Sequence, residues 1–246
     1  MTGQNVSLAV ALTLGAIALG CRSTESGRSS IRVVGCTPAE EDAIRLQEWR
    51  VLRAMEDVVV RYGLEGLDVD VVIEQEGGLG ETRPEVDLIL DVTGARVSIH
   101  RALLLDDPPA GDDVLVGLFA HELAHALHYS RMSRADLLVF AERYVRFFED
   151  PTGSLRPWAA AYEQLTDMTA IAHGYAEPLQ AQKRASALNV ARHHPKKVWD
   201  FYLTEDEIAD LGADRERLRE RMERAARTVD LASVDRFVED LLAIDD

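Results

Sequence analysis

The residues best suited to chemistry form the run His-Glu-Leu-Ala-His, inside the sequence LFAHELAHALHY at 118–129. Positions four apart lie on one face of an α-helix, so His121 and His125 can bring two imidazoles to one metal ion. Glu122 follows the first histidine, where its carboxylate can accept a proton from a water on that ion. The pattern predicts a metal site that activates water.

The helix that carries this run is expected to be apolar on almost every side. The flanking residues are Leu118, Phe119, Ala120, Leu123, Ala124, Ala126 and Leu127. Histidine and glutamate buried there without a ligand would leave polar groups unsatisfied, which destabilises the folded chain. Metal binding is therefore favoured over the alternative, two hydrogen-bonded histidines on an ordinary amphipathic helix.

A catalytic zinc ion takes three protein ligands and leaves its fourth position to water. A later helical stretch, WAAAYEQLTDMTAIAHGY at 158–175, carries Glu163 and Asp167. Glu163 can be the third ligand, and Asp167, one turn further on, can accept a hydrogen bond from a liganding imidazole. Two alternatives stay open: Asp167 is itself the ligand, or Glu163 is a solvated helical carboxylate.

Residues just beyond the first motif exclude one subclass of zinc enzyme. A metzincin would have glycine at 128 and histidine at 131, whereas this chain has His128 and Arg131. His128 is interpreted as a core residue or a neighbour of the ligands, because a fourth protein ligand would close the site. The donor for a tetrahedral oxyanion stays open among Tyr129, Tyr162, His173, Tyr175, His193, His194 and Tyr202.

The two motifs together resemble those of the gluzincin zinc metallopeptidases, and the compact arrangement is similar to the small members called minigluzincins. The resemblance implies that His121, His125 and Glu163 bind zinc. It also implies that Glu122 is the general base and that Asp167 holds a liganding histidine, His121.

The stretch Arg96–Tyr175, about a third of the chain, carries this resemblance. In gluzincins, an edge strand beside the active helix holds the substrate backbone in extended form. The segment RVSIHRA at 96–102 is placed to be that strand, which corresponds to peptide binding by strand addition.

The elements that must position these residues follow from hydrophobic periodicity. Thr37, followed by Pro38 and Glu40, predicts the start of a helix that runs to about Tyr62. Helices are also expected near 113–130, 133–148, 155–173, 179–191, 214–228 and 231–243, with a short helix capped by Thr204 and Glu207.

Strands are expected between the first helix and the metal-binding helix. DVDVVIEQ at 68–75 is rich in β-branched residues. VDLILDV at 86–92 and ARVSIHRALLL at 95–105 predict an antiparallel hairpin, joined by a tight turn at Thr93 and Gly94.

This order of elements predicts an α+β fold: a helix, a small sheet of at least three strands, then an all-helical part. The resemblance refines it to a zincin-like domain, with a small mixed sheet whose antiparallel edge strand packs on the metal-binding helix. Residues 32–246 are expected to form that single domain, because a chain of 246 residues that is 47% hydrophobic suits one sizeable core.

The first 21 residues contain no charged side chain and end in Ala-Leu-Gly-Cys. The apolar run at 6–20 has the length of a signal-peptide core and is short for a membrane span. The ending resembles the bacterial lipoprotein cleavage box, which implies that 1–21 is a signal peptide and that Cys21 becomes lipidated. Residues 22–31 then form a flexible linker. A conventional signal, an uncleaved anchor and no export are the alternatives.

A second cysteine, Cys36, has no partner if Cys21 carries lipid, and is then an apolar residue near a strand-to-helix junction. A disulfide between the two cysteines is possible only if the lipoprotein interpretation fails. Their separation of 15 positions does not suit a two-cysteine metal or redox site.

The acidic balance of the chain bears on its partners. The 27 basic and 43 acidic residues give a formal net charge of −16, which repels phosphate backbones, so nucleic acid is not expected as a partner. The sequence predicts a zinc peptidase for peptide or protein substrates, at the bacterial cell envelope, either anchored by lipid or periplasmic or extracellular. The alternatives are a zinc-binding lipoprotein that acts as a non-catalytic binding or scaffold module, and a structural lipoprotein without metal.

Overall fold

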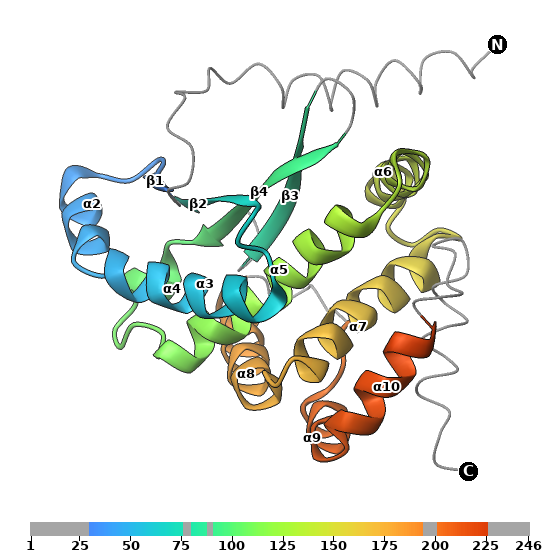
Figure 1. The fold of residues 1–246 in the computed structure, drawn as a ribbon. Coiled ribbons are helices and arrows are strands. Elements are labelled where there is room, and N and C mark those ends of the chain that lie inside the picture. The colour runs from blue at the N-terminus through green and yellow to red at the C-terminus, as the bar shows by residue number, and fades with distance from the viewer. Residues whose placement is uncertain (1–29, 76–79, 88–90, 194–200, 226–246) are drawn as a thin grey trace.

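The computed structural model describes residues 30–75, 80–87, 91–193 and 201–225 (Figure 1). The expected signal segment with Cys21 and the expected helix at 231–243 lie outside these ranges. Strand β1 already begins at Ser30, so the last two residues of the expected linker are in a strand.

The described strands form one four-stranded mixed sheet in the order β1-β2-β4-β3. Its members are β1 (Ser30–Val33), β2 (Asp68–Glu74), β3 (Gly80–Val86) and β4 (Val92–His100). β1, β2 and β4 run parallel to one another, and β3 is antiparallel to β4. The expected α+β fold with a small mixed sheet is confirmed.

An antiparallel pair precedes the helices, but its first strand is β3 at Gly80–Val86 and not 86–92, and Thr93 and Gly94 lie inside β4 instead of forming the turn. The connection is instead closed by Asp87 and Asp91: the Asp87 amide donates to the Asp91 carbonyl (3.0 Å), and the Asp91 amide donates to Asp87 Oδ1 (2.9 Å). Gly94 is required by strand spacing, since a Cβ there would lie 2.7 Å from the carbonyl oxygen of Asp68.

The identity of the edge strand also differs from the expectation. RVSIHRA belongs mostly to β4, which pairs with β2 on one side and β3 on the other and is therefore internal. β1 forms one edge of the sheet, and the edge strand beside α5 is β3, with the sequence GETRPEV. Its glycine, proline and charged residues have low β propensity, so the sequence pattern does not mark it, although proline is typical of edge strands.

Two helices lie between β1 and β2, where one helix was expected. α2 (Pro38–Arg45) begins at Thr37, whose side chain and Glu40 form the predicted capping box. The chain then breaks at Leu46 and Gln47, and α3 (Glu48–Tyr62) continues. The side-chain amide of Gln47 donates to the Leu104 carbonyl (2.6 Å), which ties the break to the short helix α4 (Ala102–Leu105).

The remaining helices follow β4 in chain order: α4 (Ala102–Leu105), α5 (Asp112–Arg131), α6 (Arg134–Glu149), α7 (Arg156–Ala172), α8 (Ala176–His193), α9 (Glu205–Ala213) and α10 (Arg215–Ala225). α5 lies at the centre of the fold and contacts β3, β4, α3, α7 and α8 (Figure 1). Its residues from Leu118 to Leu127 are all buried, as the apolar pattern predicts. Among the described residues, no helix is both long and apolar enough to cross a membrane.

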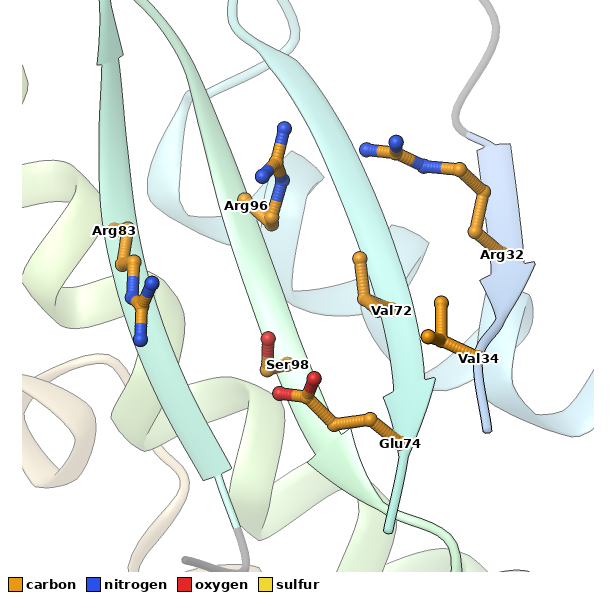
Figure 2. Close-up of a pocket in the computed structure, with 7 residues that line it drawn as sticks. All are labelled: Arg32, Val34, Val72, Glu74, Arg83, Arg96 and Ser98. Atoms are coloured by element: carbon orange, nitrogen blue, oxygen red, sulfur yellow. The ribbon is translucent and has the colours of Figure 1, made fainter. Parts of the chain in front are cut away.

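The outer face of the sheet carries a shallow hollow with three arginines (Figure 2). Its lining is Arg32, Val34, Val72, Glu74, Arg83, Arg96 and Ser98. Each arginine pairs with a carboxylate on the sheet: Arg32 with Asp70, Arg83 with Glu81 and Arg96 with Glu85. The hollow is therefore balanced in charge rather than a basic patch.

Close packing of α5 on α8 depends on Gly117. A Cβ at this position would run into the carbonyl of Pro178 and lie 2.9 Å from Gln182 Cβ. Gly117→Ala must separate the two helices, and we expect it to lower the free energy of unfolding by roughly 1–3 kcal/mol. Urea denaturation measures this change.

Gly66→Ala is the matched control, because nothing lies within 4 Å of a Cβ at position 66. Equal stability of the two variants would show that the α5–α8 contact is not close-packed at this point.

Candidate metal centre

The α5 and α7 helices bring three potential metal ligands to one point. His121 Nε2 lies 3.2 Å from Glu163 Oε2, and His125 Nε2 lies 3.5 Å from the same oxygen. The ligand atoms of the three residues all lie within 4.8 Å of one another. The histidines are 4% and 6% exposed, so this is a buried group that can hold a metal ion.

The other ring nitrogen of each histidine also has a partner, and this fixes the direction of both rings. His121 Nδ1 lies 2.8 Å from Asp167 Oδ1. His125 Nδ1 lies 3.4 Å from the Thr166 hydroxyl, which donates its own proton to the Tyr162 carbonyl and so accepts from the ring. Both Nε2 atoms are thereby left facing Glu163, the arrangement in which outer partners orient metal-binding histidines.

Asp167 connects the site to the surrounding fold. Its side chain is fully buried, and besides His121 it accepts from Lys183 Nζ (2.8 Å) and from the Leu203 amide (3.1 Å). Burial disfavours the carboxylate, but the charge of Lys183 and the His121 hydrogen bond outweigh it and lower the pKa of Asp167. Asp167 therefore remains ionised and accepts hydrogen bonds.

The neighbouring interior charges also shift the pKa values of two of the potential ligands. Burial disfavours ionised Glu163, yet the neighbouring His125 and His121 lower its pKa well below the usual value. For His121, burial and Lys183 oppose protonation, but the hydrogen bonds to Asp167 and Glu163 prevail and raise its pKa to about 9. Without metal, His121 and Glu163 thus form an ion pair at neutral pH.

Glu122 stands beside the ligand group and is held by the edge strand. The Thr82 hydroxyl donates to Glu122 Oε2 at 2.8 Å, and Glu122 Oε1 occupies room that a Cβ at Gly80 would fill. Burial raises the pKa of Glu122, and the two histidines and Thr82 offset part of this rise. The carboxylate is thus fixed in place and kept more basic than a surface glutamate.

His128 lies outside the ligand group. Its Nε2 lies 3.0 Å from the Thr169 hydroxyl, which donates to the Leu165 carbonyl and therefore accepts from the ring. Burial lowers the pKa of His128 to about 3, so it is a neutral interior residue. This agrees with its interpretation as a core residue.

The candidate oxyanion donors fall into two groups: residues that are engaged elsewhere, and residues that lie beside the ligand histidines. Tyr175 donates to Asp57 Oδ2 (2.8 Å), and His173 Nδ1 contacts the Thr169 carbonyl (2.8 Å), so both are engaged elsewhere. The ring of Tyr202 lies 5.5 Å from that of His121. Tyr129 and Tyr162 pack on His125. The side chains of His193 and His194 lie outside those that the structure describes.

Sequence reasoning missed four residues that support the site: Gly80, Thr82, Thr166 and Lys183. Thr166 lies in the same helix as Glu163 and three residues after it, so the helical spacing alone could have placed it on the face of the ligand. Gly80 and Thr82 belong to a strand without a β pattern, and Lys183 follows Asp167 by 16 residues in another helix. Only the packing of the helices and the sheet brings these three to the site.

The chain matches no family model, no curated protein and no solved structure. What the structure supports is an α+β fold with a small mixed sheet, and a buried group of His121, His125 and Glu163 that can hold a metal ion.

Metal binding should depend on pH, because a metal ion needs the lone pair on His121 Nε2. With a metal-free pKa of about 9, this histidine releases a proton on binding. The dissociation constant for zinc should therefore rise by about tenfold for each pH unit below that value. Calorimetry in buffers of different ionisation enthalpy measures the protons released. A dissociation constant that stays the same between pH 6 and 8 would contradict the shift.

Proposed function

We propose that the protein is a zinc-dependent peptidase of gluzincin type. The observation that carries this proposal is the buried group of His121, His125 and Glu163 with Glu122 beside it. A metal site that serves only structure needs ligands but no base, and a buried carboxylate is costly to keep even when it accepts a hydrogen bond. Glu122 therefore favours hydrolysis over a structural role.

The donor set suits zinc. Two imidazole nitrogens and one carboxylate oxygen are the ligands of several zinc hydrolases, and three protein ligands leave a position for water. Asp167 and Thr166 occupy the Nδ1 atoms of the two histidines, so each Nε2 remains for the metal. A bound zinc ion would supply a Lewis acid and a water of lowered pKa.

Glu122 is the residue of this chain that would move the proton. Its Oε2 is held by Thr82, so Oε1 is the atom left to accept a proton from the attacking water. Its raised pKa brings it closer to the working pH, and lets it pass the proton on to the leaving amine. Thr82 and Gly80 fix where this transfer takes place.

The edge strand β3 supports an extended peptide as the substrate. Among the described strands, β3 pairs only with β4, so its other edge offers backbone hydrogen-bonding groups. The strand adjoins the site through Thr82 and Glu122. A peptide added along β3 would pass the ligand group, which is the strand-addition mode of recognition.

The location and partners of the enzyme are part of the same proposal. The sequence ending in Cys21 favours a lipid anchor at a bacterial cell envelope, or otherwise a periplasmic or extracellular place. The net charge of −16 disfavours nucleic acid, so peptides and proteins are the proposed substrates.

Substitutions in the site separate the roles of ligands and base. In the full chain, His121→Ala and Glu163→Ala should lose zinc, which metal analysis measures. Glu122→Gln should keep one zinc per chain and lower kcat on a peptide library by about 10²–10⁴-fold, as loss of a general base does. Asp113→Asn, an exposed change at the start of α5, is the control.

Three results would contradict the proposal in different ways. Zinc binding by Glu163→Ala would reject the third ligand. A wild-type chain that holds zinc but cleaves no peptide would favour the non-catalytic binding or scaffold module. A wild-type chain that binds no zinc would reject the metal site.

The hydrogen bond from Thr82 to Glu122 gives a second test. Thr82→Val keeps the shape and removes the donor, so the ionised form of Glu122 loses a hydrogen bond and its pKa rises further. The acidic limb of the pH profile of kcat should move to higher pH, with zinc binding unchanged. Thr93→Val, in β4 of the same sheet, is the control. An unchanged acidic limb in Thr82→Val would show that Thr82 does not act on the base.

A further inference from the structure

Lys183 of α8 is a nearly buried cation behind the metal centre. Its side chain is 11% exposed, and Nζ lies 2.8 Å from Asp167 Oδ1. That same oxygen takes the hydrogen bond from His121 Nδ1, also at 2.8 Å. A buried ammonium is costly unless it is paired, so its placement beside a ligand's partner calls for a role.

Lys183 has a second contact on the other side of its ammonium group. Nζ lies 4.0 Å from the centre of the Tyr202 ring, within range of a cation–π interaction. The chain next to that tyrosine is tied to the same carboxylate, because the Leu203 amide donates to Asp167 Oδ2 at 3.1 Å. The Tyr202 ring in turn packs edge-on against His121, with 5.5 Å between ring centres.

The positive charge of Lys183 would by itself weaken the binding of a metal cation. Glu122, Glu163 and Asp167 are interior carboxylates around the two histidines, and Lys183 is a nearly buried cation paired with Asp167. With all three ionised and a divalent ion bound, the group is neutral. A lysine that acted by charge alone would repel the metal, and its removal would tighten binding.

We propose that Lys183 is a positioning residue of the metal site. It holds Asp167 in the orientation in which that carboxylate fixes the His121 ring, and it holds the Tyr202 ring against His121. The inference rests on the metal binding in the proposed function and extends it to a residue outside both motifs. If Lys183 acts through position, its loss weakens metal binding, contrary to the effect of its charge.

The test compares Lys183→Met with the wild-type chain. Methionine keeps an unbranched stem and removes the ammonium group. The zinc dissociation constant, measured by competition with a chromophoric chelator, should rise by about 10–100-fold, as for other residues that orient a ligand. The visible spectrum of the cobalt-loaded variant should change, because it reports the ligand geometry. Lys183→Arg, which keeps the charge and can pair with Asp167, should restore both toward the wild type.

Arg184→Met is the matched control, since Arg184 is the next residue of α8 and is 55% exposed. It should leave the dissociation constant and the spectrum unchanged. If Lys183→Met does not fold, as judged by circular dichroism, Lys183→Gln takes its place with the same expected direction.

A double-mutant cycle tests whether Lys183 acts through Asp167. In the Asp167→Asn background, Lys183→Met should change the zinc dissociation constant by less than about threefold, because residues that act as a unit are not additive. A full additive effect would overturn the inference.

The outcomes separate this inference from the proposed function. A wild-type chain without zinc affinity overturns the proposed function, and the inference with it. A wild-type chain that binds zinc, together with a Lys183→Met variant that binds it equally or more tightly, overturns the inference alone. Weaker zinc binding and an altered cobalt spectrum in Lys183→Met, both restored by arginine, support it.

Discussion

The pairing of buried charges is the constraint on which the rest of this structure depends. Three carboxylates and two histidines lie inside a core of apolar helices, where an unpaired charge would be costly. Glu163 is paired with the His121 and His125 rings, and Asp167 with His121 and Lys183. The helices α5, α7 and α8 must therefore keep their relative positions, because any shift would leave one of these charges without its partner.

The sheet contacts the site on the side of α5 that carries Glu122. Edge strand β3 gives Glu122 a hydrogen bond from Thr82 and room at Gly80. The same strand leaves one backbone edge available among the described elements. The proposed base, Glu122, is held by the same strand that would bind the peptide. The group that would transfer the proton therefore lies next to the substrate backbone. This proximity is what the proposed hydrolysis requires.

Much of the site followed from the sequence because its ligands lie on two helices with regular spacing. The separation of four residues between His121 and His125 places both on one face of α5, and the same separation places Glu163 and Asp167 on one face of α7. The apolar residues around His121 predicted its burial. The edge strand was assigned to the wrong segment, because hydrophobic alternation marks the well-packed internal strand β4, and β3 has low β propensity.

The sequence by itself determined the ligand types, the candidate base, the α+β order of elements and the start of α2 at Thr37, because these depend on local spacing and capping. Only the tertiary structure decided that Thr82 holds Glu122, that Lys183 shares Asp167 with His121, and that β3 is the edge strand beside α5. The Thr82–Glu122 and Lys183–Asp167 contacts join residues 40 and 16 positions apart along the chain. No local pattern encodes them, because the packing of whole elements brings such residues together.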